Sequence, residues 1–394
     1  MKRLFIAIGI TLLLLAVPAT IVLSATNAVW NKYAGNPIMF YGKPAGWDDF
    51  SIYSTEVMFW DHNDGDPSND EFYMWYSGTS YNLNDKNIGF ATSKDGMTWT
   101  KYEGNPVLVV SAFGEWDHDR INAPSVLYDP DDNTWKMWYA GVSIYNGGYA
   151  IGYATSPDGK NWTKYSDRWV FDSSGYADTF DGYSVLSPEV IKKDGKFHMW
   201  FAGNGGIASN QIGYATSLDG IHWDRVSDDP VLSVGPEGAW DEGETVSPAI
   251  IVDSQGTIHM WYQGSDGHKL YTGIGHATST DGVNWQKDAA NPLLLGENTG
   301  AWDAERVFYP TVAEDADGNR YLWYHARRVN MDTIPFKLGL AFYDFTKQPT
   351  PTPTPLPGIT PTATPTDPVI PADSDTCRQG SNHCLFLSSI RRGP

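Results

Sequence analysis

The chain has 394 residues, a formal net charge of -20 and an aromatic content of 14%, with 17 tryptophans. This is enough apolar and aromatic material to bury a large core. The acidic balance argues against nucleic acid or an anionic membrane surface as a partner, because both are negatively charged.

Residues 1–25 have the pattern of an export signal. Two basic residues near the start precede an apolar run that ends at Leu23, and small residues follow it. The run is about as long as a bilayer is thick, so the segment is either a cleaved signal peptide or an N-terminal anchor. We therefore expect an extracellular or cell-surface protein.

Five copies of one pattern follow this segment. The copy that starts at Trp116 reads WDHDRINAPSVLYDPDDNTWKMWYAGVSIYNGGYAIGYATSPDGKNW. The tryptophan of its MWY strand recurs at intervals of 63, 62, 61 and 62 residues, at Trp75, Trp138, Trp200, Trp261 and Trp323. A fixed period with four short strands per copy is typical of a β-propeller, with one blade per copy.

Two stretches define each copy. The first is a Trp-Asp or Phe-Asp followed by an apolar strand, and it reads WDDFSIYSTEV, WDHDRINAPSV, FDGYSVLSPEV, WDEGETVSPAI and WDAERVFYPTV. The second is an SxDGxxW hairpin, present in four copies, whose Asp-Gly pair supplies the positive φ angles of a tight turn. Residues shared by all copies are predicted to be scaffold, including the acids Asp48, Asp117, Asp181, Asp241 and Asp303.

The fifth copy ends without a hairpin or a closing tryptophan. Its missing strand is found at the other end of the domain, where residues 29–39 (VWNKYAGNPIM) match residues 98–108 (TWTKYEGNPVL). We predict that the strand around Trp30 completes the fifth blade and closes the ring, which leaves no long unpaired inner edge. The sequence therefore predicts an all-β, five-bladed β-propeller over residues 28–347, and a monomer.

The C-terminal region has a different composition. Residues 348–371 form a Pro/Thr-rich linker, and residues 372–394 form a short tail of unknown role. The tail carries both cysteines, Cys377 and Cys384, which could close a small loop in an oxidising compartment. The tail or the N-terminal segment would attach the protein to a cell surface.

Function is expected where the copies differ, close to the central channel. One column of the first strands holds Glu56, Ser125, Glu189, Ala249 and Thr311. Glycosidic bond cleavage needs two carboxyl groups, about 5–5.5 Å apart for retention or 6.5–9.5 Å for inversion. We predict Glu189 as general acid and Glu56 as base or nucleophile, facing each other across the channel.

A second set of residues that differ between the copies precedes this column. Asp119, Arg120, Glu244 and Arg306 are predicted to hold substrate, with structural ion pairs at the channel mouth as the alternative. Tyr53, Tyr183 and Phe308 are predicted to stack on sugar faces. His325 is a candidate for a metal site or a proton relay, with a structural role as the alternative. No cofactor is required, although the central channel allows a Ca²⁺ ion.

Together, five copies, an x-P-x-V first strand and aromatic second strands resemble the five-bladed propeller glycosidases of families 43, 62, 32 and 68. These include arabinanases, xylosidases, invertases and levansucrases. The resemblance implies an exported glycoside hydrolase that acts on oligo- or polysaccharide. The positions where family 43 would have its catalytic acids hold Ser54, Ser125 and Leu186, so those residues cannot be carried over. The alternative is a non-catalytic surface propeller that binds glycan or protein.

Overall fold

The computed structural model describes residues 30–62, 64–81, 86–142, 148–166, 168–206, 209–267, 272–296, 301–304, 306–327 and 335–343. The described residues form one compact unit. The predicted export signal, the linker and both cysteines lie outside the described residues. Within the described ranges, no helix is long and apolar enough to cross a membrane.

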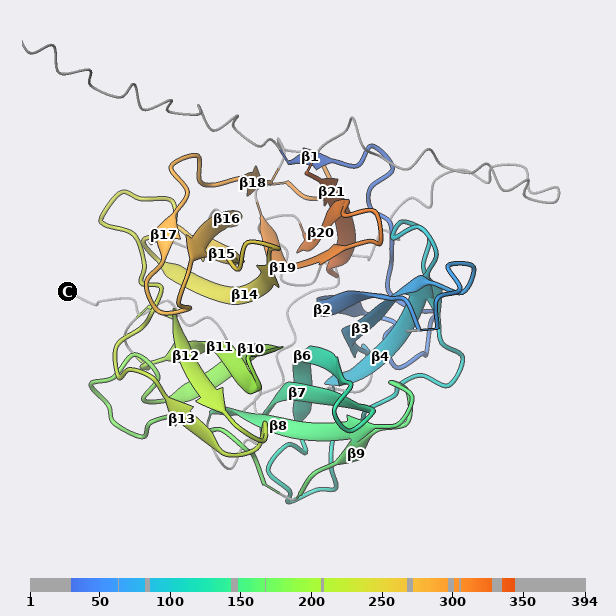
Figure 1. The fold of residues 1–394 in the computed structure, drawn as a ribbon, viewed down its shortest axis with the longest axis horizontal. Coiled ribbons are helices and arrows are strands. Elements are labelled where there is room, and N and C mark those ends of the chain that lie inside the picture. The colour runs from blue at the N-terminus through green and yellow to red at the C-terminus, as the bar shows by residue number, and fades with distance from the viewer. Residues whose placement is uncertain are drawn as a thin grey trace, which may run out of the picture. The chain divides into compact units, whose positions relative to one another are not determined.

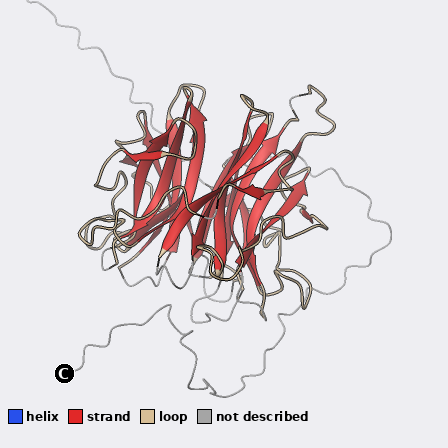
Figure 2. Cartoon of the chain, turned by 90° about the horizontal axis from the view of Figure 1, so that it is seen from below, coloured by secondary structure: helices blue, strands red, loops and turns tan. Residues whose placement is uncertain are grey.

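All regular structure in the described chain is β-strand (Figure 2). The strands follow one another in the same order in each copy. The first strands are β2 (Ser51–Trp60), β6 (Arg120–Asp129), β10 (Ser184–Lys193), β14 (Glu244–Val252) and β19 (Val307–Glu314). The second strands are β3 (Glu71–Thr79), β7 (Thr134–Val142), β11 (Lys196–Asn204), β15 (Ile258–Ser265) and β20 (Arg320–Ala326). The third strands are β4 (Lys86–Ser93), β8 (Tyr149–Ser156), β12 (Gln211–Ser217), β16 (Thr272–Ser279) and β21 (Lys337–Phe342). The short outer strands are β1 (Asn31–Lys32), β5 (Thr100–Lys101), β9 (Thr163–Lys164), β13 (Trp223–Arg225), β17 (Gln286–Lys287) and β18 (Leu294–Leu295).

These strands pair antiparallel within each copy, in the order first, second, third, outer. The first strands lie nearest the centre, as Figure 1 shows, and each contacts the first strands of its neighbours, including β19 with β2. The sheets of the first two copies are joined by a single parallel residue pair, Lys86 with Arg120. This arrangement is that of a β-propeller.

A buried tryptophan in each second strand packs the copies together. All five are at most 1% exposed. Four of them donate their indole N–H to the glycine carbonyl of a neighbouring Asp-Gly turn: Trp75 to Gly159, Trp138 to Gly220, Trp200 to Gly282 and Trp323 to Gly96, at 2.7–3.0 Å. The Trp261 indole N–H has no hydrogen-bond partner among the described residues. The repeated turn therefore holds adjacent sheets together, as expected of scaffold.

The N-terminal strand β1 pairs with β21, with Asn31 opposite Phe342. Its Lys32 lies 2.5 Å from the buried carboxylate of Asp303. Each of the other four copies has an equivalent ion pair between an outer-strand cation and the acid of its Trp-Asp or Phe-Asp pair. These are Lys101–Asp48, Lys164–Asp117, Arg225–Asp181 and Lys287–Asp241. These acids are therefore structural, and β1 occupies the place of an outer strand in the last sheet.

Each first strand contains a β-bulge near its middle. The residue before the proline, or before Thr55 in β2, has a positive φ of 46–52°: Ser54, Ala123, Ser187, Ser247 and Tyr309. The register with the second strand shifts at the same place. An L-residue rarely adopts this conformation, and a bulge changes the direction of the side chains that follow it. The column that contains Glu56 and Glu189 comes directly after this bulge.

Candidate active site

The channel has a narrow middle and a wider end. The five bulges line the narrow part, whose cavity of about 20 Å³ holds roughly one water molecule. A cavity of about 480 Å³ follows at the C-terminal ends of the first strands, with a mainly apolar lining that includes Val57, Leu127 and Ile250. Glu56 and Glu189 line both cavities and separate them.

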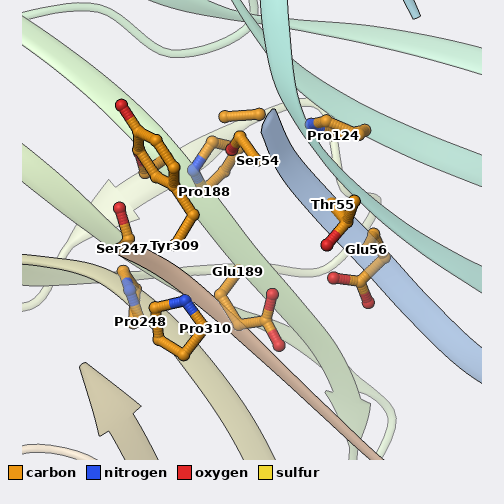
Figure 3. Close-up of a pocket in the computed structure, with 12 residues that line it drawn as sticks. Ser54, Thr55, Glu56, Pro124, Pro188, Glu189, Ser247, Pro248, Tyr309 and Pro310 are labelled. Carbon is orange, nitrogen blue, oxygen red and sulfur yellow. The ribbon is translucent and has the colours of Figure 1, made fainter. Parts of the chain in front are cut away.

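Glu56 on β2 and Glu189 on β10 point toward each other, as Figure 3 shows. Burial holds the pKa of Glu56 well above its usual range, and the neighbouring carboxyl group of Glu189 raises it further. Burial also raises the pKa of Glu189 to about 8, although the backbone N–H of Ile250 donates to it at 3.0 Å. Both carboxyl groups are therefore harder to ionise than an exposed glutamate.

The assignment of Glu189 as general acid and Glu56 as base or nucleophile stays a prediction. The two side chains point toward each other, as that assignment requires, and the pKa of each is raised, as a general acid requires.

The column after the bulge joins neighbouring copies. The backbone N–H of Val57 donates to Thr311 Oγ1 at 3.2 Å, and that of Val190 donates to Ser125 Oγ at 2.9 Å. The bond from Ile250 to Glu189 repeats the same relation one copy further on. Glu189 therefore accepts a backbone N–H from the next copy, as Ser125 and Thr311 do. The side chain of Glu56 instead points toward Glu189.

The predicted substrate-binding residues lie at the other end of the channel. Arg120 and Glu244 are the first residues of β6 and β14, and Tyr183 and Arg306 directly precede β10 and β19. Arg120 lies five positions before Ser125, which occupies the column of Glu56 in the same strand, and this corresponds to about 16 Å. The loops between second and third strands end here too, since Lys86 pairs with Arg120 and Thr272 pairs with Arg306. We call this end, formed by the starts of the first and third strands, the mouth.

Glu244 is the buried carboxyl group of the mouth. Only 8% of the residue is exposed. The side-chain amide of Gln263 donates to one of its oxygens at 3.1 Å, and that of Asn210 donates to the other at 3.4 Å. The Gln263 carbonyl in turn accepts from the backbone N–H of Tyr309 at 3.2 Å. Two neutral donors thus fix the orientation of this carboxyl group from neighbouring strands.

An aromatic cluster lies beside Glu244. Tyr53, Phe308 and Tyr309 each have ring centres within 6.1 Å of the Phe336 ring, and the Arg327 guanidinium lies 4.7 Å from the Phe336 ring centre. Tyr53 and Phe308 are buried, so the structure differs from the expectation that their faces are open to sugar. Tyr183 is 55% exposed and is the predicted aromatic residue best placed to stack on a ligand.

Sequence comparison missed Lys86, the first residue of β4. Its ammonium lies 4.9 Å from the centre of the Tyr53 ring, and its backbone pairs with Arg120. Burial lowers the pKa of Lys86, and the adjacent Arg120 lowers it further. The equivalent third-strand positions of other copies hold Tyr149 and Thr272, so the break in symmetry was visible in the sequence, but only the first and second strands had been compared.

The remaining predicted residues have local partners. Asp119 lies 3.4 Å from His118. His325 is fully buried with Nε2 3.4 Å from Thr55 Oγ1, and burial lowers its pKa to about 3. Among the described residues, no group of three or more His, Cys, Asp or Glu side chains is placed to hold a metal ion. Ca²⁺ takes six to eight oxygen ligands, and a Ca²⁺ ion in the central channel stays a prediction.

Comparison with known proteins gives one family match and several relatives. Residues 25–178 match the model of the glycosyl hydrolases family 32 N-terminal domain. An uncharacterized protein of Mycobacterium tuberculosis is 33% identical over 195 residues, which cover 48% of this chain and 60% of that protein. The chain thus matches less than two thirds of the length of this relative.

Two solved structures have the same fold. An N-acetylgalactosamine deacetylase from Flavonifractor plautii, in complex with blood group B trisaccharide, has a TM-score of 0.60 at 19% identity, over 79% of this chain and 95% of that one. An α-L-arabinofuranosidase from Podospora anserina, in complex with cellotriose, has a TM-score of 0.58 at 12% identity, over 80% and 97%. At these identities the likeness establishes the fold, and this fold carries more than one kind of sugar chemistry.

Proposed function

We propose that this chain, which has the β-propeller fold of the glycoside hydrolases and matches the family 32 N-terminal domain over residues 25–178, cleaves glycosidic bonds of an oligo- or polysaccharide. The observation that carries the proposal is the set of residues at the mouth. A buried carboxyl group, Glu244, is held by two amides beside aromatic and basic side chains, which is the composition of a sugar site.

We further infer that the propeller has five blades and that β1 closes the ring. The pairing of β1 with β21 supports this closure, as does the ion pair between Lys32 and Asp303. The contact between β19 and β2 joins the last copy to the first. A closed ring keeps the five strand starts at fixed positions around the mouth, as a preorganised site requires.

In the proposed mechanism, Glu244 is the general acid or base at the mouth and Asp119 supplies the second carboxyl group. Tyr183 stacks on the sugar, and Arg120 and Arg306 bind its polar groups. The Glu56–Glu189 pair forms the floor of the channel. The assignment made from the sequence, with Glu189 as general acid and Glu56 as base or nucleophile, is the alternative.

Activity measurements on substitutions distinguish these assignments. The substrates are arabinan, xylan, fructan and aryl glycosides, and the variants are Glu244→Gln, Asp119→Asn, Glu56→Gln and Glu189→Gln. We expect Glu244→Gln to lower kcat by about 10²–10⁴-fold, the contribution of a general acid–base group, and the two channel variants to retain most activity. If Glu56→Gln and Glu189→Gln lose activity while Glu244→Gln remains active, the catalytic residues are Glu56 and Glu189 instead.

A second candidate function is glycan binding without hydrolysis. It is favoured by the residues at the family 43 acid positions, Ser54, Ser125 and Leu186, none of which is an acid. Binding on a glycan array, with no turnover of any bound glycan, would identify this function.

We also propose, from the sequence of residues 1–25 and 348–394, that the protein is exported and held at the cell surface as a monomer. Cell fractionation, with mass spectrometry of the mature N-terminus, tests both export and cleavage. Recovery of the uncleaved chain in the soluble intracellular fraction would contradict the proposal.

A further inference from the structure

Two basic side chains lie next to each other at the mouth. Lys86 and Arg120 come from neighbouring copies, and their backbones form the one parallel pair that joins β4 to β6. The ammonium of Lys86 is held over the Tyr53 ring, 4.9 Å from its centre. The Nε of Arg120 is buried and has no hydrogen-bond partner within the described ranges.

This pair differs from the scaffold cations. The outer-strand cations, such as Lys101 and Lys164, each lie within 2.7 Å of a buried aspartate. No described carboxylate lies within ion-pair distance of Lys86 or Arg120. Two adjacent like charges repel, and partial burial increases the cost because water screens them less. The chain has a net charge of -20, yet the described acids of the mouth, Asp119 and Glu244, form no ion pair with Lys86 or Arg120.

Two further basic groups lie at the same end of the channel. Arg306 directly precedes β19, and Arg327 directly follows β20, whose last residue pairs with the first residue of β19. The Arg327 guanidinium is positioned over the Phe336 ring. The mouth therefore combines cations from three different copies with aromatic surface.

We propose that the mouth recognises an acidic sugar, whose anionic group is bound between Lys86 and Arg120. A guanidinium and an ammonium side by side provide several N–H donors for the oxygens of a carboxylate or of a sulfate or phosphate ester. The anion supplies the negative charge that the described protein groups do not, and the sugar ring extends toward Tyr183 and Glu244. This inference rests on the proposed function for the location of the site, and it adds the class of substrate.

Matched pairs of glycans test the charge requirement. Binding of the full chain to polygalacturonate, glucuronoxylan and alginate is measured by calorimetry against the carboxyl-reduced form of each polymer, which keeps the linkage and removes the charge. Galactose 6-sulfate and galactose 6-phosphate, each against galactose, distinguish ester anions from carboxylates. We expect at least about tenfold tighter binding of an acidic member of a pair, with an affinity that falls as salt is raised.

Substitutions test the residues. Lys86→Met and Arg120→Met keep the aliphatic part of the side chain, and each should weaken binding of the acidic glycan at least about tenfold more than binding of the neutral form. Lys196→Met makes the same charge change at the exposed β10–β11 hairpin, at the other end of the strands, and should have no effect. Thermal unfolding confirms that each variant is folded. If Arg120→Met does not fold, Lys86→Met and the salt dependence of the unmodified chain still decide the question.

The outcomes separate this inference from the proposed function. Equal binding of acidic and neutral forms, or acidic binding that is unaffected by Lys86→Met, overturns the inference, while hydrolysis of a neutral glycan would leave the proposed function in place. Acidic binding that depends on Lys86, without hydrolysis of any bound glycan, supports the inference and contradicts a glycosidase.

Discussion

Glu56 and Glu189 occupy the same position in two copies, but they have different partners. Glu189 accepts a backbone N–H from the next copy, as Ser125 and Thr311 do, whereas Glu56 has the other carboxyl group as its partner. Glu244 is also buried, but amide donors orient it. The buried Glu56–Glu189 pair, whose pKa values are both raised, makes the stability of the domain depend on pH.

The pH dependence of stability should report the Glu56–Glu189 pair. Both pKa values are raised above the ordinary 4.5, so the folded state retains protons that the unfolded state releases. The stabilisation is complete below about pH 4.5 and is lost as the pH rises through about 8. We therefore expect Glu56→Gln to raise Tm relative to the unmodified chain more at pH 9 than at pH 5. The exposed Glu103→Gln is the control, and parallel Tm curves for Glu56→Gln and the unmodified chain would contradict the expectation.

Some of the site could be predicted from single residues, and some could not. Alignment of the copies identified Glu56, Glu189, Arg120 and Glu244 because each breaks a repeated column. It could not give their depth in the channel, which depends on how many residues of strand separate two columns. Tyr53 was expected to face sugar, but it is buried because Phe336, distant in sequence, covers the cluster to which it belongs.

At the level of strands and turns, the Asp-Gly hairpin does two things. It reverses the chain, as its sequence predicted, and its glycine carbonyl accepts the indole N–H of a neighbouring copy. The second role was not predicted, because the distance between a turn and a tryptophan of another sheet is not encoded in local propensity. The bulge in each first strand was also missed, since serine or alanine before proline does not by itself indicate a positive φ.

Paired substitutions measure the contribution of this contact between sheets. Trp138→Phe removes a buried hydrogen bond to Gly220, whereas Trp261→Phe removes an indole whose N–H has no acceptor in the described chain. Both remove the same ring. Trp138→Phe should therefore lower the free energy of unfolding by about 0.5–1.5 kcal/mol more than Trp261→Phe does, because it removes one hydrogen bond while the Gly220 carbonyl still accepts the indole N–H of Trp223. Urea unfolding gives both values, and equal losses would show that the bond contributes nothing.

At the scale of the whole propeller, the two ends of the domain meet in one sheet. The match of residues 29–39 to residues 98–108 predicted this sheet, and β1 pairs with β21. Sequence was a good guide here because a missing strand and an extra copy of the same strand are both visible in an alignment. The linker, the tail and the export signal lie outside the described residues, so their assignments stay predictions.

Removing the anchor of β1 should destabilise the entire domain. Trp30 is 5% exposed and packs edge-on against Trp261, with ring centres 6.0 Å apart. Trp30→Ala should cost about 3–5 kcal/mol, the usual range for a buried aromatic residue, and should lower a single unfolding transition. Phe113→Ala, at a residue that is 81% exposed, should have almost no effect. A separate early transition, with the remainder unfolding at the original temperature, would contradict a closed cooperative ring.

The shared last sheet also constrains biosynthesis. A translating ribosome releases Asn31–Lys32 among the first residues and Lys337–Phe342 only after the other four sheets have been made. β1 must therefore remain unpaired until translation of the domain is nearly complete. Throughout that interval the last sheet lacks its outer strand, and it is complete only when Asn31–Lys32 pairs with Lys337–Phe342.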